Sequence, residues 1–293
     1  MKKANVYFTQ EITPESLIKI YHAMGVTLNG KIGVKISTGE PGGHNFLNPN
    51  LIKNLVQEIQ GTIIECNTAY PGKRNTSKDH WQTIDAHGFS QITLCDIMDD
   101  KNEIAIPVIA GKHLKENYVG ETIKNYNAIL MLSHFKGHAM GGFGGALKNM
   151  SIGMASSQGK TLIHTAGKSE LFKDVFTADQ DSFLEAMADA DKSVIDFMGK
   201  DNIVYINVAN KLSVDCDCDS NPAEPKMADI GIFASLDPVA LDQACVDAVY
   251  NSADAGKKYL IERMESRNAI HIIEAAVDLG LGQREYQIVP MDK

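Results

Sequence analysis

The sequence lacks the usual features of a secreted or membrane-spanning protein. Its 293 residues contain only five cysteines, at irregular positions, which do not make the dense disulfide framework of a small secreted domain. No apolar run approaches the length of a membrane span, and residues 1–3 lead directly into a strand-like segment without the apolar region of a signal peptide. We therefore expect a cytoplasmic protein, without a membrane partner, whose cysteines are core residues or ligands.

The sequence also has fewer basic than acidic residues. The chain has 28 Lys and Arg against 37 Asp and Glu, which gives a net charge of −9. A surface of this sign does not attract nucleic acid, so we expect no nucleic-acid partner. No linker rich in proline, glycine or serine divides the chain, and no repeat is present. The simplest prediction is a single α/β domain over residues 1–293, in which the sheet could be subdivided.

Apolar strand-like runs alternate with helical patterns, which is typical of proteins with a parallel sheet. We expect a mainly parallel, mixed sheet flanked by helices in three layers. The expected strands are 32–36, 62–65, 92–95, 128–132, 203–208 and 230–234. The expected helices are 49–59, 76–87, 180–198, 238–250 and 270–279, with Asn48 and Asp237 as N-caps.

Polar loops follow four of these strands and begin at Ser37, Cys66, Ser133 and Lys211. If the four strands are parallel, their carboxyl ends meet at one edge of the sheet, where open α/β sheets bind ligands. The sequence therefore predicts that these loops form one site.

The last of these loops contains two cysteines, Cys216 and Cys218, within an alternating run with three aspartates. In an extended chain residues i and i+2 face the same side, so both sulfur atoms would project together. Such thiolates favour zinc, copper(I) or an iron–sulfur cluster over calcium or magnesium. The alternative is a pair of inert cysteines in an acidic turn. A disulfide between them would close a very short ring, and we rank it lower still.

Two histidines, His134 and His138, flank Lys136 in another of these loops. A lone histidine is usually a hydrogen-bonded structural residue, whereas two in one loop favour a role as metal ligands or their supports. Lys136 would then bind an anion or act as an acid.

A glycine-rich segment precedes an expected short helix that carries Lys148. Its glycines, which could present backbone N–H groups to a phosphate or carboxylate, are Gly141, Gly142, Gly144 and Gly145. The segment matches neither the dinucleotide nor the P-loop pattern, and close packing or a mobile lid would explain it equally well.

The remaining polar motifs are less distinctive. Lys73 and Arg74 could clamp a carboxylate, although most such pairs are solvated surface. Cys66 and Cys245 lie in apolar contexts and are expected in the core, and Cys95 is undecided. Residues 99–100, two aspartates, are expected to form an exposed turn, with magnesium chelation as the weaker alternative.

Two blocks of sequence resemble a large, biochemically undefined prokaryotic family, catalogued as domain of unknown function 362. The first block is 134–138 with 145–153, and the second is 215–218 with 225–232 and 237–242. The resemblance extends over nearly the whole chain. Members of the family are often described as iron–sulfur proteins, which here would rest on the two cysteines of the second block because a C-x2-C-x2-C run is missing.

These observations leave three functions open. The first is a metal-binding enzyme, with zinc or an iron–sulfur cluster, that acts on a small anionic substrate. In this hypothesis Cys216 and Cys218 hold the metal, and His134 and His138 complete the site, or two chains share a cluster in a homodimer. The second is a metal or cluster carrier or sensor, and the third is a metal-free enzyme that processes anions. The expected catalytic residues are Lys136, Lys148 and His138.

Overall fold

A single mixed sheet runs through the centre of the protein. The structure is a computed structural model that describes residues 2–292. Within those residues eight strands form this sheet, in the order β12-β1-β11-β10-β7-β2-β3-β4. Their bounds are β1 Ala4–Thr9, β2 Ile32–Lys35, β3 Thr62–Glu65, β4 Cys95–Ile97, β7 Ala128–His134, β10 Ile203–Ala209, β11 Gly231–Ser235 and β12 Tyr286–Pro290.

The centre of the sheet is parallel. Strand β7 pairs in parallel with both β10 and β2, and β3 joins β2 to β4 in the same direction. Strand β11 runs antiparallel to β10 and β1. Strands β10, β7, β2 and β3 therefore end at the same edge, which places the four polar loops beside one another.

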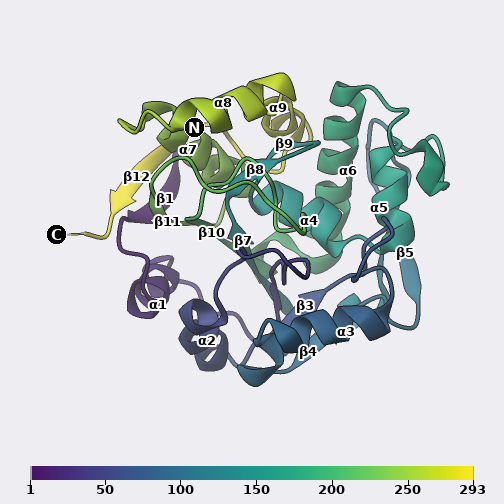
Figure 1. Ribbon diagram of the computed structural model, residues 1–293, viewed down its shortest axis with the longest axis horizontal. Helices are drawn as coiled ribbons and strands as arrows, with labels where there is room; N and C mark the ends of the chain where they lie inside the picture. The colour runs from purple at the N-terminus through teal and green to yellow at the C-terminus, as the bar shows by residue number, and fades with distance from the viewer. Residues whose placement is uncertain (1, 293) are drawn as a thin grey trace.

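Helices cover both faces of the sheet, as Figure 1 shows. Helices α1, α2 and α3 pack on one face through residues such as Leu17 and Ile52, and α4, α6 and α7 pack on the other through residues such as Met150 and Leu241. The helix bounds are α1 Pro14–Ala23, α2 Pro49–Glu58, α3 Ser77–Ala86, α4 Ala146–Met154, α5 Ser157–His164, α6 Gln180–Met198, α7 Pro238–Asn251, α8 Lys257–Ser266 and α9 His271–Asp278.

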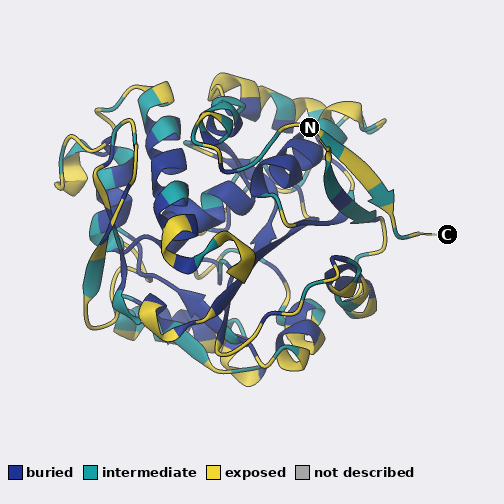
Figure 2. Cartoon of the chain, turned by 180° about the vertical axis from the view of Figure 1, so that it is seen from behind, coloured by how far each residue is buried: buried dark blue, intermediate teal, exposed yellow. Residues whose placement is uncertain are grey.

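The strands in the middle of the sheet are buried on both faces (Figure 2). Because successive side chains of a strand point to opposite faces, Ile129 and Met131 of β7 enter one core, and Leu130 and Leu132 enter the other. This double burial explains the continuous apolar runs in the sequence.

Two small antiparallel pairs lie outside the main sheet. Strands β5 (Glu103–Pro107) and β6 (Glu116–Gly120) form one pair, and β8 (Lys136–His138) and β9 (Gly142–Gly144) form the other. The second pair follows directly from β7, so it holds His138 next to the end of a central strand.

The expected α/β class, a mainly parallel mixed sheet between layers of helices, is confirmed. Both expected N-caps are present, since the side chains of Asn48 and Asp237 accept hydrogen bonds from backbone N–H groups of the helices they precede. The expected strand 92–95 is displaced, because β4 pairs with β3 only from Cys95 onward. Within residues 2–292, no helix is long and apolar enough to cross a membrane.

Candidate functional site

A cavity of about 220 Å³ lies at the carboxyl edge of the parallel strands. Its lining includes a residue from each of the four loops: Ser37, Cys66, His138 and Cys218. The predicted convergence of these loops is therefore confirmed. Helices α4 and α5, which close the cavity from one side, contribute Lys148 and Lys160.

A buried network of ion pairs forms one wall of the cavity. Lys35 Nζ lies 2.7 Å from Glu65 Oε2, and Arg74 lies 3.5 Å from the other oxygen of the same carboxylate. Arg74 Nε also donates to Glu40 at 2.9 Å, and Tyr70 donates to the same Glu40 oxygen at 2.7 Å. Two cations thus face two carboxylates, and the network is close to neutral.

The ion pairs keep Glu65 charged despite its burial. Burial alone would raise the pKa of this carboxyl group, but Lys35 and Arg74 lower the pKa to about 2. The same ion pairs keep the guanidinium of Arg74 charged. Burial alone would lower its pKa, but the nearby anionic groups outweigh this effect and raise it. This wall is therefore a fixed, charged framework near neutral pH.

Lys148 and Lys160 add positive charge that this network does not balance. Among the described residues, neither lysine forms a salt bridge with a carboxylate, and Lys160 donates to the carbonyl oxygen of Ala155. Burial, together with the cations Lys136 and Lys35, lowers the pKa of Lys148 to about 7. Burial also lowers the pKa of Lys160. The lining of the cavity consequently carries positive charge that an anionic ligand could balance.

Two histidines in the lining are held neutral. Burial and the neighbouring Lys148 lower the pKa of His138 well below its ordinary value. Burial lowers the pKa of His164 to about 4, and its Nδ1 donates to the carbonyl oxygen of Lys160. Neutral imidazoles add no further charge to the cavity, and the one N–H group of His164 is already used by the Lys160 carbonyl oxygen.

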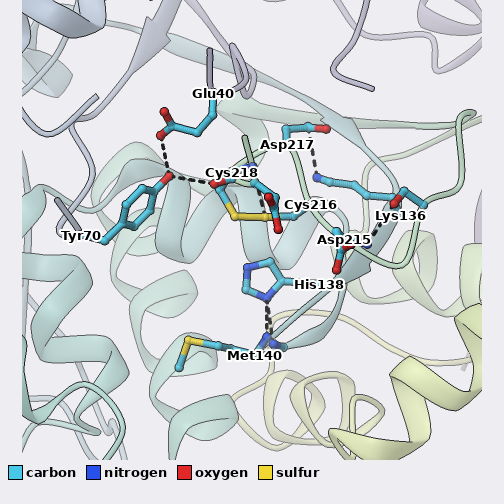
Figure 3. The surroundings of a disulfide bond; sticks show 12 residues. Glu40, Tyr70, Lys136, His138, Met140, Asp215, Cys216, Asp217 and Cys218 are labelled. Carbon is cyan, nitrogen blue, oxygen red and sulfur yellow. Dashed lines mark hydrogen bonds and ion pairs between the residues drawn. A yellow bond between two sulfur atoms is a disulfide. The ribbon is translucent and has the colours of Figure 1, made fainter. Parts of the chain in front are cut away.

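Cys218, which lines the cavity, is joined to Cys216 by a disulfide, and this corrects our ranking of that alternative (Figure 3). The segment is a tight turn and not the extended chain we expected: Cys218 N–H faces Cys216 Sγ at 3.2 Å, and Asp219 N donates to the Cys216 carbonyl oxygen. The Cα atoms of the pair are consequently 5.2 Å apart, within the usual range for disulfides.

His138 lies beside this disulfide (Figure 3). Among residues 2–292, one ligand atom each of His138, Cys216 and Cys218 lie within 4.8 Å of one another. Two thiolates and an imidazole match the number of protein ligands at a catalytic zinc ion, provided that the disulfide is reduced. An iron–sulfur cluster commonly has four protein ligands, whereas this group contains three, and Cys66, Cys95 and Cys245 lie outside it.

The hydrogen bonds of His138 disfavour metal binding in this conformation. Its Nδ1 accepts from the backbone N–H groups of Gly141 at 2.8 Å and Met140 at 3.3 Å. A backbone N–H group can only donate, so Nδ1 must be the unprotonated nitrogen of the neutral ring. The proton is therefore on Nε2, on the side of the sulfur atoms (Figure 3). A metal on Nε2 would require the glycine-rich segment to release Nδ1.

His134 and Lys136 contact the buried carboxylate of Asp217 and not the two cysteines. The ring nitrogens of His134 contact Asp217 Oδ1 at 2.8 Å and the Asn210 carbonyl oxygen at 2.6 Å. Lys136 Nζ is 3.3 Å from Asp217 Oδ2. Burial opposes ionisation of Asp217, but His134 and Lys136 lower its pKa. This arrangement differs from the expected metal ligation by His134, and it gives Lys136 a carboxylate partner that it shares with His134.

The glycine-rich segment is part of the β8–β9 hairpin, and its packing leaves no free helix end for an anion. Asp242 accepts hydrogen bonds from Ala146 N at 2.8 Å and Leu147 N at 3.0 Å. Gly145 is required there, since a Cβ atom would lie 2.4 Å from Asp242 Oδ1. Of this segment and its helix, only Lys148 provides charge to the cavity.

The remaining predicted residues divide between the interior and the surface. Arg74 is buried in the cavity wall, whereas the adjacent Lys73 is exposed and lines a shallow outer groove. Cys66 and Cys245 are buried, as expected, and Cys66 lines the cavity. Asp99 accepts from Asn67 N and Ser157 N, so it holds two loops together.

The sequence patterns did not single out several residues of the site. Lys35 and Glu65 each end an otherwise apolar strand, and they lie on the adjacent parallel strands β2 and β3. A charged residue within a run that must be buried is itself a signal, because burial of a single charge is costly without a partner. Lys160 and His164 lie on α5, a helix that we did not predict.

Comparisons with known proteins found two solved structures with partial similarity and one matching family. A lactate racemase apoprotein from Thermoanaerobacterium thermosaccharolyticum is similar with a TM-score of 0.46 and 14% identity, over 84% of this chain and 57% of that one. A protein from Thermotoga maritima is similar with a TM-score of 0.44 and 15% identity, over 83% of this chain and 59% of that one. This chain thus spans less than two thirds of the length of either structure.

No curated protein matches the sequence. The model of the family described as "Domain of unknown function (DUF362)" matches residues 32–247, which confirms the resemblance carried by the two motif blocks. The chain belongs to this family of proteins, domain of unknown function 362.

Proposed function

We propose that the protein is an enzyme that binds a small organic anion in the cavity and uses Lys148 for proton transfer. The observation that carries the proposal is the excess positive charge of Lys148 and Lys160 beside a neutral network of ion pairs. An ammonium group is rarely desolvated without a partner of opposite charge, and an anionic ligand would supply one.

The pKa of Lys148 suits it to acid–base chemistry. With a pKa of about 7, both the charged and the neutral form are well populated near neutral pH. A group of this kind can accept a proton from a bound molecule and return it, which is most efficient when its pKa is close to the working pH. In this proposal Lys160 holds the negative charge of the ligand, and His138 donates from Nε2.

Titration calorimetry with a panel of small anions tests the proposal. We expect at least one carboxylate or phosphate to bind to the wild-type protein at pH 6.5, and Lys148→Met to weaken that affinity at least fivefold. The matched control is Lys53→Met, which removes an exposed lysine on α2. If no anion binds, or if the two variants behave alike, the proposal fails.

A second candidate function is a soft-metal carrier, sensor or metalloenzyme, and the group of His138, Cys216 and Cys218 supports it. Reduction of the disulfide would provide two thiolates, and zinc would then find three protein ligands. Protein purified without oxygen and with a reductant should contain about one equivalent of zinc, which Cys216→Ser with Cys218→Ser abolishes. Less than about a tenth of an equivalent of any transition metal in the wild-type protein contradicts this candidate.

A further inference from the structure

The lining of the cavity also contains a set of apolar side chains. These are Met140, Ile152, Phe172, Val175 and Phe176. Ile152 belongs to α4, which also carries Lys148 one turn earlier. A molecule that fills the cavity would therefore contact both cationic groups and hydrocarbon.

The mouth of the cavity exposes large apolar side chains. Phe176 is 79% exposed and Phe172 is 38% exposed, although both line the cavity. Phe172 begins the short helical turn Phe172–Asp174, which follows α5, and Phe176 comes two residues after that turn. Exposed phenylalanines grouped at the entrance of a cavity are typical of ligand sites, because a bound molecule covers them.

The charge and size of the cavity limit the ligand further. Glu65 and Glu40 already balance Lys35 and Arg74, so only Lys148 and Lys160 remain to attract an anion. This excess suits one carboxylate and not a polyphosphate chain. The volume of about 220 Å³ lies below the range of ~300–1,000 Å³ for pockets that hold drug-sized molecules, so the ligand is small.

We propose that the ligand is an amphipathic monocarboxylic acid, whose carboxylate lies between Lys148 and Lys160 and whose apolar body lies against Ile152, Val175 and Phe176. The inference rests on the proposed function, since it names the substrate class of the same cavity. It excludes inorganic phosphate and hydrophilic polyanions as preferred ligands.

Calorimetric titration with acetate, butyrate, hexanoate and inorganic phosphate tests this inference. Each buried methylene group should tighten binding about three- to fourfold, so hexanoate should bind roughly 100-fold more tightly than acetate. Phe176→Ser should weaken hexanoate binding several-fold and leave acetate binding unchanged. Because Phe176 is exposed, the substitution is not expected to impair folding.

Phe197→Ser is the matched control, since Phe197 is 42% exposed on α6 and does not line the cavity. It should not change the affinity for any of the four ligands. If phosphate binds as tightly as hexanoate, or if chain length has no effect, the substrate class is wrong and the anion-binding function survives. If none of the four binds but another anion of the panel does, the substrate class alone is wrong; if no anion binds, both are wrong.

Discussion

Replacement of Lys148 by methionine should stabilise the folded protein, although it should also weaken anion binding. The pKa of this lysine is lowered from 10.5 to about 7 because the cavity desolvates it and places it near other cations. The folded state therefore binds its proton less tightly than the unfolded chain does. Methionine keeps the length of the side chain and removes the charge.

The size of the effect follows from the linkage between proton binding and stability. With ~1.4 kcal/mol for each tenfold change in proton affinity, the charged lysine costs at most about 5 kcal/mol of folding free energy at pH 6. Between pH 7 and 10.5 the unfolded chain binds the proton and the folded protein does not, so the cost declines to about 2 kcal/mol at pH 9. Movement of neighbouring side chains will reduce both figures.

Urea unfolding at pH 6 and pH 9 measures this difference. Lys148→Met should be more stable than the wild type, with the larger gain at pH 6. Lys53→Met, at an exposed position, should be within about 0.5 kcal/mol of the wild type at both pH values. A Lys148→Met variant that is less stable than the wild type, or whose gain does not depend on pH, would refute the electrostatic account of the cavity.

Three further predictions concern the framework around the site. Glu65→Gln leaves Lys35 without a carboxylate partner and removes one of the two carboxylates that face Arg74, so it should cost about 3–5 kcal/mol in urea unfolding at pH 7. Since the pKa of Glu65 is lowered to about 2, the stability that its ion pairs contribute is present above pH 4.5 and declines as the pH falls towards 2. If the stability difference between the wild type and Glu65→Gln is unchanged down to pH 3, the ion pairs are not its cause. Gly145→Ala should reduce the free energy of unfolding by about 1–3 kcal/mol, because the new methyl group meets Asp242. Gly141→Ala should reduce it less, because the nearest atom to its methyl group would be 3.4 Å away. Equal losses in the two variants contradict this packing. Alkylation of the denatured, unreduced protein should label three cysteines, Cys66, Cys95 and Cys245, and reduction should make the remaining two available. Labelling of all five cysteines without a reductant would contradict the disulfide.

The position of the site was predictable from the sequence, because it depends on the order of strands. Apolar, β-branched runs such as 203–208 indicate buried strands, and parallel strands bring their following loops to one edge. Ser37, Cys66, His138 and Cys218 meet there for this reason.

The partners of individual side chains were less predictable, since they depend on the local course of each loop. The tight turn at Cys216 and Cys218 is not visible in the alternation of residues that suggested an extended chain. Asp217 pairs with His134, which ends strand β7. Asp242, on helix α7, accepts hydrogen bonds from the backbone N–H groups at the start of α4. Contacts of this kind join residues 80 or more positions apart, which periodicity does not report.

Some elements carry only weak periodic signals. Helix α5 is short, and it contains Gly159, where a Cβ atom would collide with the carbonyl oxygen of Tyr118. Its glycine serves close packing against β6 and lowers the helical propensity of the segment. Lys160, which belongs to this helix, was missed for the same reason.

A crystal structure of the protein grown with hexanoate tests the central claim most directly. The account predicts a carboxylate oxygen at a hydrogen-bonding distance of about 2.7–3.2 Å from Lys148 Nζ, with the alkyl chain directed towards Phe176. Ordered water alone in the cavity at a saturating concentration of hexanoate, or a carboxylate bound outside the cavity, would contradict it.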